Sequence, residues 1–436
     1  MSGDSIKTMS VAAQLRPLVN RLIGETDVRI EFWDGSAFGP DDSKGTLFVR
    51  SPNALRRIMW APNELGPGRA YVAGELDAEG DIFTIIELLK PAGLHLQSAA
   101  RAIPAAFKAA TKLRVLGPPP NPPKEEARHR GLRHSKARDA KAISHHYDVG
   151  NEFYEIVLGP AMTYSCARWT DSKMNLVEAQ ASKHDVICKK LGLDGRPGMR
   201  LLDVGCGWGS MVLHAAQHYG VSAVGITISE EQCARARERV KAAGLEDRVE
   251  IRLQDYRDLG GERFDAISSV GMFEHVGKER LNEYFSVLRS LLPEHGRLLN
   301  HAISSVGGSK IDKHSFMGRY VFPDGELIDV GDVVLAMEAA GFEVRDVEGL
   351  REHYALTLRS WVANLEAQWD RAVELVGGPR ARVWRIYMAA SAVGFEDGGL
   401  GLHQVLGVIP DADGGSGMPR TRDGWGRRRH RPLRTT

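Results

Sequence analysis

Hydrophobic residues in the second half of the chain form short runs that alternate with helical patterns. Apolar runs at 199–204, 221–227, 249–253, 264–270 and 297–303 predict buried β-strands. The segments around and between them predict helices, at 175–191, 210–218 and 230–243. This alternation predicts an α/β fold with a doubly wound, mainly parallel sheet and right-handed crossovers.

The first of these strands runs directly into three glycines at every second position. Asp203 stands near its end, and Gly205, Gly207 and Gly209 follow it. A tight glycine turn between a buried strand and a helix is typical of α/β nucleotide sites. The spacing differs from the dinucleotide fingerprint, and a carboxylate at Asp203 would repel a pyrophosphate but attract an amino group. The pattern D-x-G-x-G-x-G resembles motif I of the S-adenosylmethionine (SAM) methyltransferases; an ordinary glycine turn in another α/β protein is the alternative.

Polar residues follow the ends of the other predicted strands. Ligands of parallel sheets bind at the carboxyl ends of the strands, so one crevice should gather Gly205, Thr227, Asp255, Glu274 and His301. The second strand offers Thr227, then Ser229 and Gln232, so neutral groups would hold a ribose. Glu274 and His275 could serve chemistry or simply cap the next helix.

The first part of the chain predicts a smaller α+β domain. Strands are expected at 28–33 and 46–50, and helices at 54–59 and 81–89. Residues 91–123 contain no acidic side chain; this basic amphipathic stretch fits an anionic membrane surface or a helix that covers its own domain. The expected organisation is an N-terminal domain at 1–115, a Pro-rich and charged linker at 116–141, a main domain at 142–410 and a basic, disordered tail at 411–436.

The composition of the chain restricts the class of protein and the cellular compartment that we expect. A hydrophobic content of 43% and a charged content of 26% indicate a soluble globular chain, and a net charge of +1 gives no reason to expect nucleic acid. The four cysteines lack zinc-site spacing, so no metal and a reduced, cytoplasmic setting are expected. Neither a signal peptide nor an apolar run of transmembrane length is present.

Five motifs taken together resemble the cyclopropane-fatty-acid synthase family. They are His146–Tyr154, Thr163–Ala167, Leu202–Gly209, Val270–Gly277 and His353–Leu358. The resemblance covers roughly residues 142–410. The first block resembles the lipid-binding domain of the full-length, phospholipid-acting members. The Pro-rich linker is most similar to that of the subgroup that methylates oleoyl phospholipid on the way to 10-methylstearic (tuberculostearic) acid.

The resemblance implies SAM as methyl donor and a bicarbonate ion as base. SAM contacts are implied for Tyr164, Ser165, Asp203, Gly205, Gly207, Gly209, Thr227, Ser229, Gln232, Asp255 and Tyr256. The bicarbonate cradle would consist of Cys166, Glu274, His301, Tyr354 and the backbone of Ile303. Methyl transfer to an alkene leaves a carbocation, which Tyr147 would stabilise through its ring.

Two positions in this set need comment. Glu274 beside a bicarbonate would bring two anions together, so either a shared proton or a cationic His301 is expected. Cys166 is expected to be a hydrogen-bonding ligand, with a buried small residue as the alternative. Many family members carry a further cysteine in an A-C-A context, whereas this chain has Ala390-Ser391-Ala392, which excludes a role for a thiol there.

The leading hypothesis is transfer of a one-carbon unit from SAM to the cis double bond of a phospholipid acyl chain. The product would be a methylene- or methyl-branched chain, with a cyclopropane ring as the alternative. The partners expected are phospholipid acyl chains at the inner membrane face, where the protein would bind peripherally, with a separate reductase and a second copy of the chain as possible others. Hypotheses outside this class are an inactive lipid- or SAM-binding protein and a methyltransferase for small molecules or nucleic acid.

Overall fold

The computed structural model describes residues 9–89, 104, 107–126, 149–194, 198–309, 311–322 and 325–425, and it divides into two compact units. Unit 1 takes its described residues from 1–129, 312–323 and 376–393. Unit 2 takes its described residues from 130–311, 324–375 and 394–436. Two short segments that follow the methyltransferase-like strands in sequence therefore belong to the unit built by the N-terminal block.

Unit 1 is a small α+β unit around a four-stranded sheet in the order β2-β1-β3-β4. β1 and β3 pair in parallel, while β2 and β4 are antiparallel to their neighbours. Its elements are α1 (Val11–Ile23), β1 (Arg29–Phe32), β2 (Ala37–Phe38), β3 (Gly45–Val49), α2 (Pro52–Trp60), α3 (Leu65–Val72), β4 (Leu76–Gly80), α4 (Ile82–Leu89), α12 (Phe316–Tyr320) and most of α16 (Gly378–Glu396). Alternating burial along β1 and β3 explains why the period-2 pattern predicted both strands.

The distant segments of unit 1 are held by polar contacts. Arg385, on α16, donates to the hydroxyl of Tyr71 at 2.9 Å and to the carbonyl of Ala78 at 3.0 Å. The Pro-rich segment is bound to unit 1, because Arg57 donates to the carbonyl of Asn121 at 2.8 Å. Glu126 forms a bidentate ion pair with Arg69 at 2.7 and 2.8 Å. Residues 115–126 therefore lie on the unit that they follow in sequence.

Unit 2 confirms the predicted doubly wound sheet. Its strand order is β11-β12-β9-β8-β5-β6-β7, with β10 beside β9; the pairs among β5 to β9 are parallel, and β12 is antiparallel to β9 and β11. The strands are β5 (Arg200–Val204), β6 (Ser222–Thr227), β7 (Val249–Leu253), β8 (Ala266–Val270), β9 (Arg297–Ser305), β10 (Ile328–Asp329), β11 (Glu343–Gly349) and β12 (Gly401–Val408). The helices are α7 (Asn151–Leu158), α8 (Leu176–Leu191), α9 (Ser210–Tyr219), α10 (Glu230–Ala242), α11 (Leu281–Ser290), α13 (Val330–Ala339), α14 (Arg351–Ala367) and α15 (Trp369–Val376). Short 3₁₀ turns are η1 (Gly159–Ala161), η2 (Tyr256–Asp258), η3 (Phe273–His275), η4 (Lys278–Arg280) and η5 (Arg422–Gly424).

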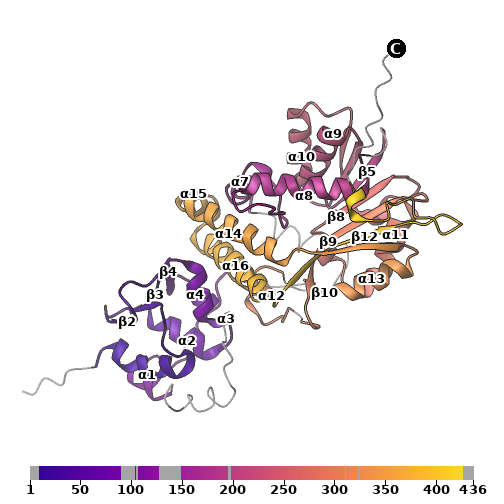
Figure 1. The fold of residues 1–436 in the computed structure, drawn as a ribbon. Helices are drawn as coiled ribbons and strands as arrows, with labels where there is room; N and C mark the ends of the chain where they lie inside the picture. Colours follow the sequence, from indigo (N-terminus) through magenta and orange to yellow (C-terminus); the bar gives the residue numbers. More distant parts are fainter. Residues whose placement is uncertain are drawn as a thin grey trace, which may run out of the picture. The chain divides into compact units, whose positions relative to one another are not determined.

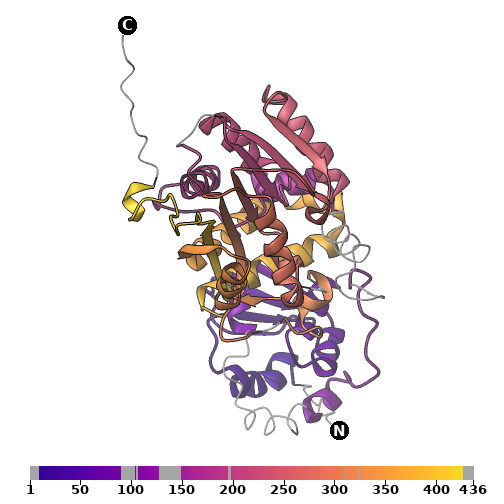
Figure 2. The ribbon, with the colours of Figure 1, turned by 90° about the vertical axis from the view of Figure 1, so that its right-hand side faces the viewer.

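Helices cover both faces of this sheet (Figure 1 and Figure 2), and each face has its own hydrophobic core. Leu201, on one face, packs in the core that α8, α9 and α10 complete. Leu202, on the other face, packs in the core that α11 and α13 complete. The switch between adjacent residues follows from the alternation of side chains along a strand, and burial on both faces explains the continuous apolar runs in the sequence.

Part of the expected disordered tail is ordered in unit 2. Asp411 accepts a hydrogen bond from the ring of His295 at 3.0 Å, and Trp425 packs against the core on the α8 face. Arg422 pairs with Asp346, whose carboxylate is buried. Residues 426–436 lie outside the described part of the chain. Among the described residues, no helix is long and apolar enough to cross a membrane.

The ion pair between Asp346 and the buried Lys190, at 2.9 Å, leads to a prediction about the stability of unit 2. The substitution Lys190→Met would leave this carboxylate short of a buried counter-charge, which costs about 3 kcal/mol or more. We expect the free energy of unfolding of unit 2, measured by urea denaturation, to fall by that amount. The matched control is Lys189→Met, whose half-exposed ion pair with Asp185 should contribute under about 1 kcal/mol. Equal losses for the two variants would contradict this assignment.

Candidate functional site

The glycine turn after β5 builds one wall of a pocket at the carboxyl ends of the strands. Gly205, Gly207 and Gly209 adopt φ values of 78°, 53° and 80°, which side-chain-bearing residues rarely tolerate. At Gly205 a Cβ atom would lie 2.7 Å from the Cβ of Met272, so only glycine lets the two segments approach. Gly209 then caps the N-terminus of α9, and its Cβ position faces Ala236 of α10 at 3.4 Å.

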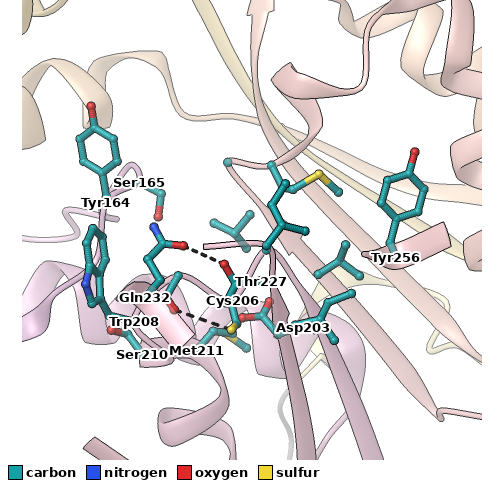
Figure 3. Close-up of a pocket in the computed structure, with 18 of the residues that line it drawn as sticks. Tyr164, Ser165, Asp203, Cys206, Trp208, Ser210, Met211, Thr227, Gln232 and Tyr256 are labelled. Atoms are coloured by element: carbon teal, nitrogen blue, oxygen red, sulfur yellow. Dashed lines mark hydrogen bonds between the residues drawn. The ribbon is translucent and has the colours of Figure 1, made fainter. Parts of the chain in front are cut away.

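Most residues implied in SAM binding line this one pocket. They are Tyr164, Ser165, Asp203, Gly205, Gly207, Thr227, Gln232, Asp255 and Tyr256. Figure 3 shows Tyr164 and Trp208 at one end and Tyr256 at the other, with Thr227, Gln232 and Asp203 between them. Two expected contacts are not among the lining residues: Gly209 shapes the turn, and Ser229 caps α10 by accepting from the amide of Gln232 at 3.3 Å.

The polar groups of the pocket differ in charge from strand to strand: those at the end of β6 are neutral, and the one at the end of β5 is a carboxyl group. At the end of β6, the hydroxyl of Thr227 donates to the amide oxygen of Gln232 at 2.9 Å, which gives the neutral pair expected beside a ribose. At the end of β5, Asp203 is buried and accepts from the hydroxyl of Ser268 at 2.6 Å. Burial raises the pKa of Asp203 to about 6, against the lowering by Ser268 and by Lys183. Asp255 is bound by the guanidinium of Arg257 at 2.6 and 2.8 Å.

A second group of buried side chains lies around β9, next to the pocket. Glu274 Oε1 accepts from the amide of Ile303 at 2.8 Å, so this amide is already engaged. His301 stands two residues earlier on the same face of β9, and its carbonyl accepts from the amide of Gly271, which lines the pocket. Within the described part of the chain, neither Glu274 Oε2 nor His301 Nε2 has a hydrogen-bond partner, although both atoms are buried. Such orphaned polar atoms indicate a site for a small polar guest.

Cys166 and Tyr354 join this group through the backbone. Cys166 Sγ contacts the carbonyl of Leu350 at 3.7 Å, and the same carbonyl accepts from the amide of Tyr354. The amide of Leu350 donates to Leu402, which pairs with Ile303. These contacts connect the backbone segments that carry Cys166, Ile303 and Tyr354, and Glu274 and His301 adjoin the last strand of that connection through β9. Tyr147 lies outside the described residues.

Burial sets the protonation of this group. It raises the pKa of Glu274, against the lowering by the Ile303 amide. It raises the pKa of Cys166 far above its ordinary value, which keeps a thiol in place. It lowers the pKa of His301 well below its ordinary value, assisted by Lys183 and Lys190. In the absence of a bound anion, burial therefore favours a neutral His301 and a protonated Glu274; which of the two expectations holds beside an anion stays a prediction.

Aromatic rings connect the pocket to this buried group. The ring of Tyr154 lies 4.6 Å from that of Trp208 and 5.6 Å from that of Tyr164. Trp361 continues the series, 5.2 Å from Tyr164 and 5.9 Å from Tyr354. These ring contacts form a continuous series from the pocket residues Tyr164 and Trp208 to Tyr354.

Sequence reasoning missed the buried Lys183, which also lines the pocket. It stands on α8 among the buried positions Ala179, Gln180, His184, Ile187 and Cys188. A lysine on the apolar side of a helix was the available signal, because such a side chain is rarely buried without a reason.

Comparison with known proteins places this arrangement in a family. Residues 134–405 match the family described as mycolic acid cyclopropane synthetase. A probable fatty acid methyltransferase of Mycobacterium tuberculosis is 43% identical over 407 residues, 91% of this chain and 94% of that protein. The cyclopropane-fatty-acyl-phospholipid synthase of Escherichia coli K12 is 36% identical over 93% of this chain and 97% of its own length.

A solved structure extends the likeness to the fold. The crystal structure of mycolic acid cyclopropane synthase CmaA1 complexed with SAH and CTAB has a TM-score of 0.58 and 33% identity. It covers 62% of this chain and 98% of its own, whereas the two relatives above match nearly end to end. The chain therefore belongs to the cyclopropane synthetase family of SAM-dependent methyltransferases.

Proposed function

We propose that the protein transfers a one-carbon unit from SAM to the cis double bond of an unsaturated acyl chain, oleoyl in the first instance, on a membrane phospholipid. The observation that carries the proposal is the pair of unpartnered, buried atoms Glu274 Oε2 and His301 Nε2 beside the donor pocket. A methyltransferase that acts on a simple nucleophile needs no second site for a base. A reaction in which the product must lose a proton after methyl transfer needs one.

The aromatic series suits the first step. The π electrons of the alkene attack the donor methyl group, the carbon–sulfur bond breaks, and a carbocation remains on the acyl chain. An alkene is a weak nucleophile, so a dry, closely aligned site is required. Ring faces such as those of Tyr164 and Trp361 attract the cation without offering it a nucleophile.

The group around β9 suits the second step. Bicarbonate, when bound, supplies a mild base for the proton that the new methyl group loses. Protonated Glu274 can donate from Oε2. The amide of Gln404 lies 3.2 Å from His301 Nδ1 and can donate to it, which leaves the imidazole proton on Nε2 as a second donor. These two donors fit an oxyanion, and neither carries a negative charge of its own while Glu274 is protonated. The Cys166 thiol donates to the carbonyl of Ala167 at 3.1 Å and would have to turn from it to act as a third donor.

The names of the relatives allow either product. The protein with 43% identity is named a probable fatty acid methyltransferase, which fits a branch, whereas the cyclopropane synthase, at 36% identity, is more similar than the tuberculostearic acid methyltransferase UfaA1, at 31%. From the relative with 43% identity we propose a methylene-branched acyl chain as the direct product, with a separate reductase completing the methyl branch. A cyclopropane ring is the second candidate. Loss of a proton from the new methyl group closes the ring directly on the neighbouring cationic carbon, whereas the methylene branch forms when a hydride first shifts from the methyl-bearing carbon to that neighbour and the methyl group then loses a proton.

Unit 1 offers a surface for the membrane. Met59, Trp60 and Leu116 are exposed apolar residues, and the indole of Trp60 donates to the carbonyl of Gly117 at 3.0 Å, which places it beside Leu116. Arg56 lies at the same place, with its guanidinium within 3.4 Å of the Cβ position of Gly117. A tryptophan flanked by an arginine suits the interface of an anionic bilayer. We propose that this surface docks the protein peripherally on the cytoplasmic membrane face.

The catalytic prediction concerns Glu274. The substitution Glu274→Gln keeps the size and the hydrogen-bond donor of the side chain but cannot release or take up a proton, so we expect turnover to fall about 100-fold or more while SAH binding stays unchanged. The control is Glu283→Gln, an exposed position on α11. Turnover is followed by mass spectrometry of oleoyl-phospholipid vesicles incubated with SAM, and the product is then treated with ozone.

Each result of that assay has a meaning. A gain of one CH₂ unit in a chain that ozone still cleaves supports the methylene branch. The same gain in a chain that resists ozone supports the ring. Absence of any gain by the unaltered protein overturns the proposed function, and full turnover by Glu274→Gln removes Glu274 from the mechanism.

The docking prediction concerns Trp60. The substitution Trp60→Ala should weaken binding to anionic vesicles about tenfold, because a half-exposed indole no longer enters the interface. SAH binding in solution should not change. Leu335→Ala, which removes an exposed apolar side chain from α13 of unit 2, is the control and should leave vesicle binding intact. Vesicle sedimentation measures both, and equal effects of the two substitutions would contradict this surface.

A further inference from the structure

Lys183 is a buried basic side chain in the wall of the donor pocket. Its side chain is 1% exposed, and Nζ donates to the hydroxyl of Ser165 at 2.8 Å. Both residues line the donor pocket. Among the described residues, no carboxylate lies at ion-pair distance from Nζ. An ammonium group in this position is costly unless a ligand supplies the missing negative charge.

The groups that face Lys183 come from several elements. Asp203 on β5 and Cys166 after η1 act on its charge directly, and its charge acts in turn on His184, His214 and His301. Burial lowers the pKa of Lys183 to about 7, against the raising effects of Cys166 and Asp203. Since the nearby histidines are held neutral by burial and Cys166 remains a thiol, Asp203 is the one opposite charge in this set.

The pocket therefore presents one buried positive and one buried negative group near the end of β5. Thr227 and Gln232 occupy the end of β6, where the ribose is expected, and Tyr256 follows β7. The amino-acid part of SAM or SAH is a zwitterion, with an ammonium group and a carboxylate on one carbon. Asp203 can satisfy the first of these charges, and nothing in the predicted SAM contacts satisfies the second.

We propose that Lys183 binds the α-carboxylate of the donor, opposite Asp203, which binds its ammonium group. Lys183 then selects adenosyl ligands that carry an intact amino acid and rejects their decarboxylated analogues. Ser165 assists by orienting Nζ. The inference rests on SAM as the donor and does not depend on which acyl chain accepts the methyl group.

The first test compares two ligands on three proteins by isothermal titration calorimetry. The ligands are SAH and S-adenosyl-3-thiopropylamine, which differ only in the carboxylate. The unaltered protein should prefer SAH about 30-fold or more, the usual size of a buried charge pair. Lys183→Met should bind both ligands equally weakly, and Lys189→Met, which removes an exposed positive charge from the same helix, should behave like the unaltered protein.

Equal binding of the two ligands by the unaltered protein overturns the proposal and needs no variant to fold. A preference that survives in Lys183→Met overturns it as well. A preference for SAH in a protein that fails to modify acyl chains would leave this proposal intact and remove the proposed function alone.

The second test is the pH dependence of SAH affinity, which a merely structural lysine would not shape. Above the pKa of about 7 the free protein must gain a proton at Lys183 to bind, so affinity should fall as pH rises. Below the pKa of about 6 Asp203 must lose a proton, so affinity should fall as pH drops. Lys183→Met should abolish the alkaline limb and keep the acidic one. An alkaline limb that persists in this variant contradicts the assignment.

Discussion

Burial of ionisable groups without water is the constraint on which the site depends. At the carboxyl end of the sheet, burial raises the pKa of Glu274 and of Cys166 and lowers that of His301, because each would be charged only at the cost of desolvation. The neutral forms that burial favours are weak bases and weak nucleophiles. Neutral Glu274 and His301 can donate hydrogen bonds to an anion in a dry site, which is what the proposed bicarbonate would require.

The two cores on either side of the sheet make this burial possible. Strands β5, β8 and β9 are buried on both faces, so their carboxyl ends reach the site in fixed positions. The glycine turn after β5 then brings backbone close to Met272 without a side chain between them. Aromatic rings from Trp208 to Tyr354 complete a path from the donor pocket to the acidic group.

The strands of the parallel sheet could be predicted because burial on both faces leaves long apolar runs. β11 escaped prediction because its sequence is rich in charges; Asp346 and Glu348 lie there to pair with the buried Lys190. The tail escaped for the same reason, since Arg422 finds its partner only in the folded sheet. The make-up of unit 1 could not be foreseen either, because Arg385 joins Tyr71 from more than 300 residues away.

The candidate site, too, could be predicted from local sequence patterns only in part. The donor pocket followed from local patterns, above all the glycine turn and the polar residues after each strand. The group around β9 came from a family resemblance, because no local pattern links Cys166 to Tyr354. The role proposed for Lys183 came from neither source, since it depends on the position of its buried side chain beside Ser165 in the folded pocket.

The most direct test of the central claim is the fate of the transferred methyl group. Oleoyl-phospholipid vesicles would be incubated with the protein and SAM carrying a fully deuterated methyl group, and the product would be weighed by mass spectrometry. The account predicts that two of the three deuterium atoms remain in the acyl chain, because the base removes one from the new methyl group. Retention of all three, with the hydrogen lost elsewhere, or absence of label from the acyl chain would contradict it.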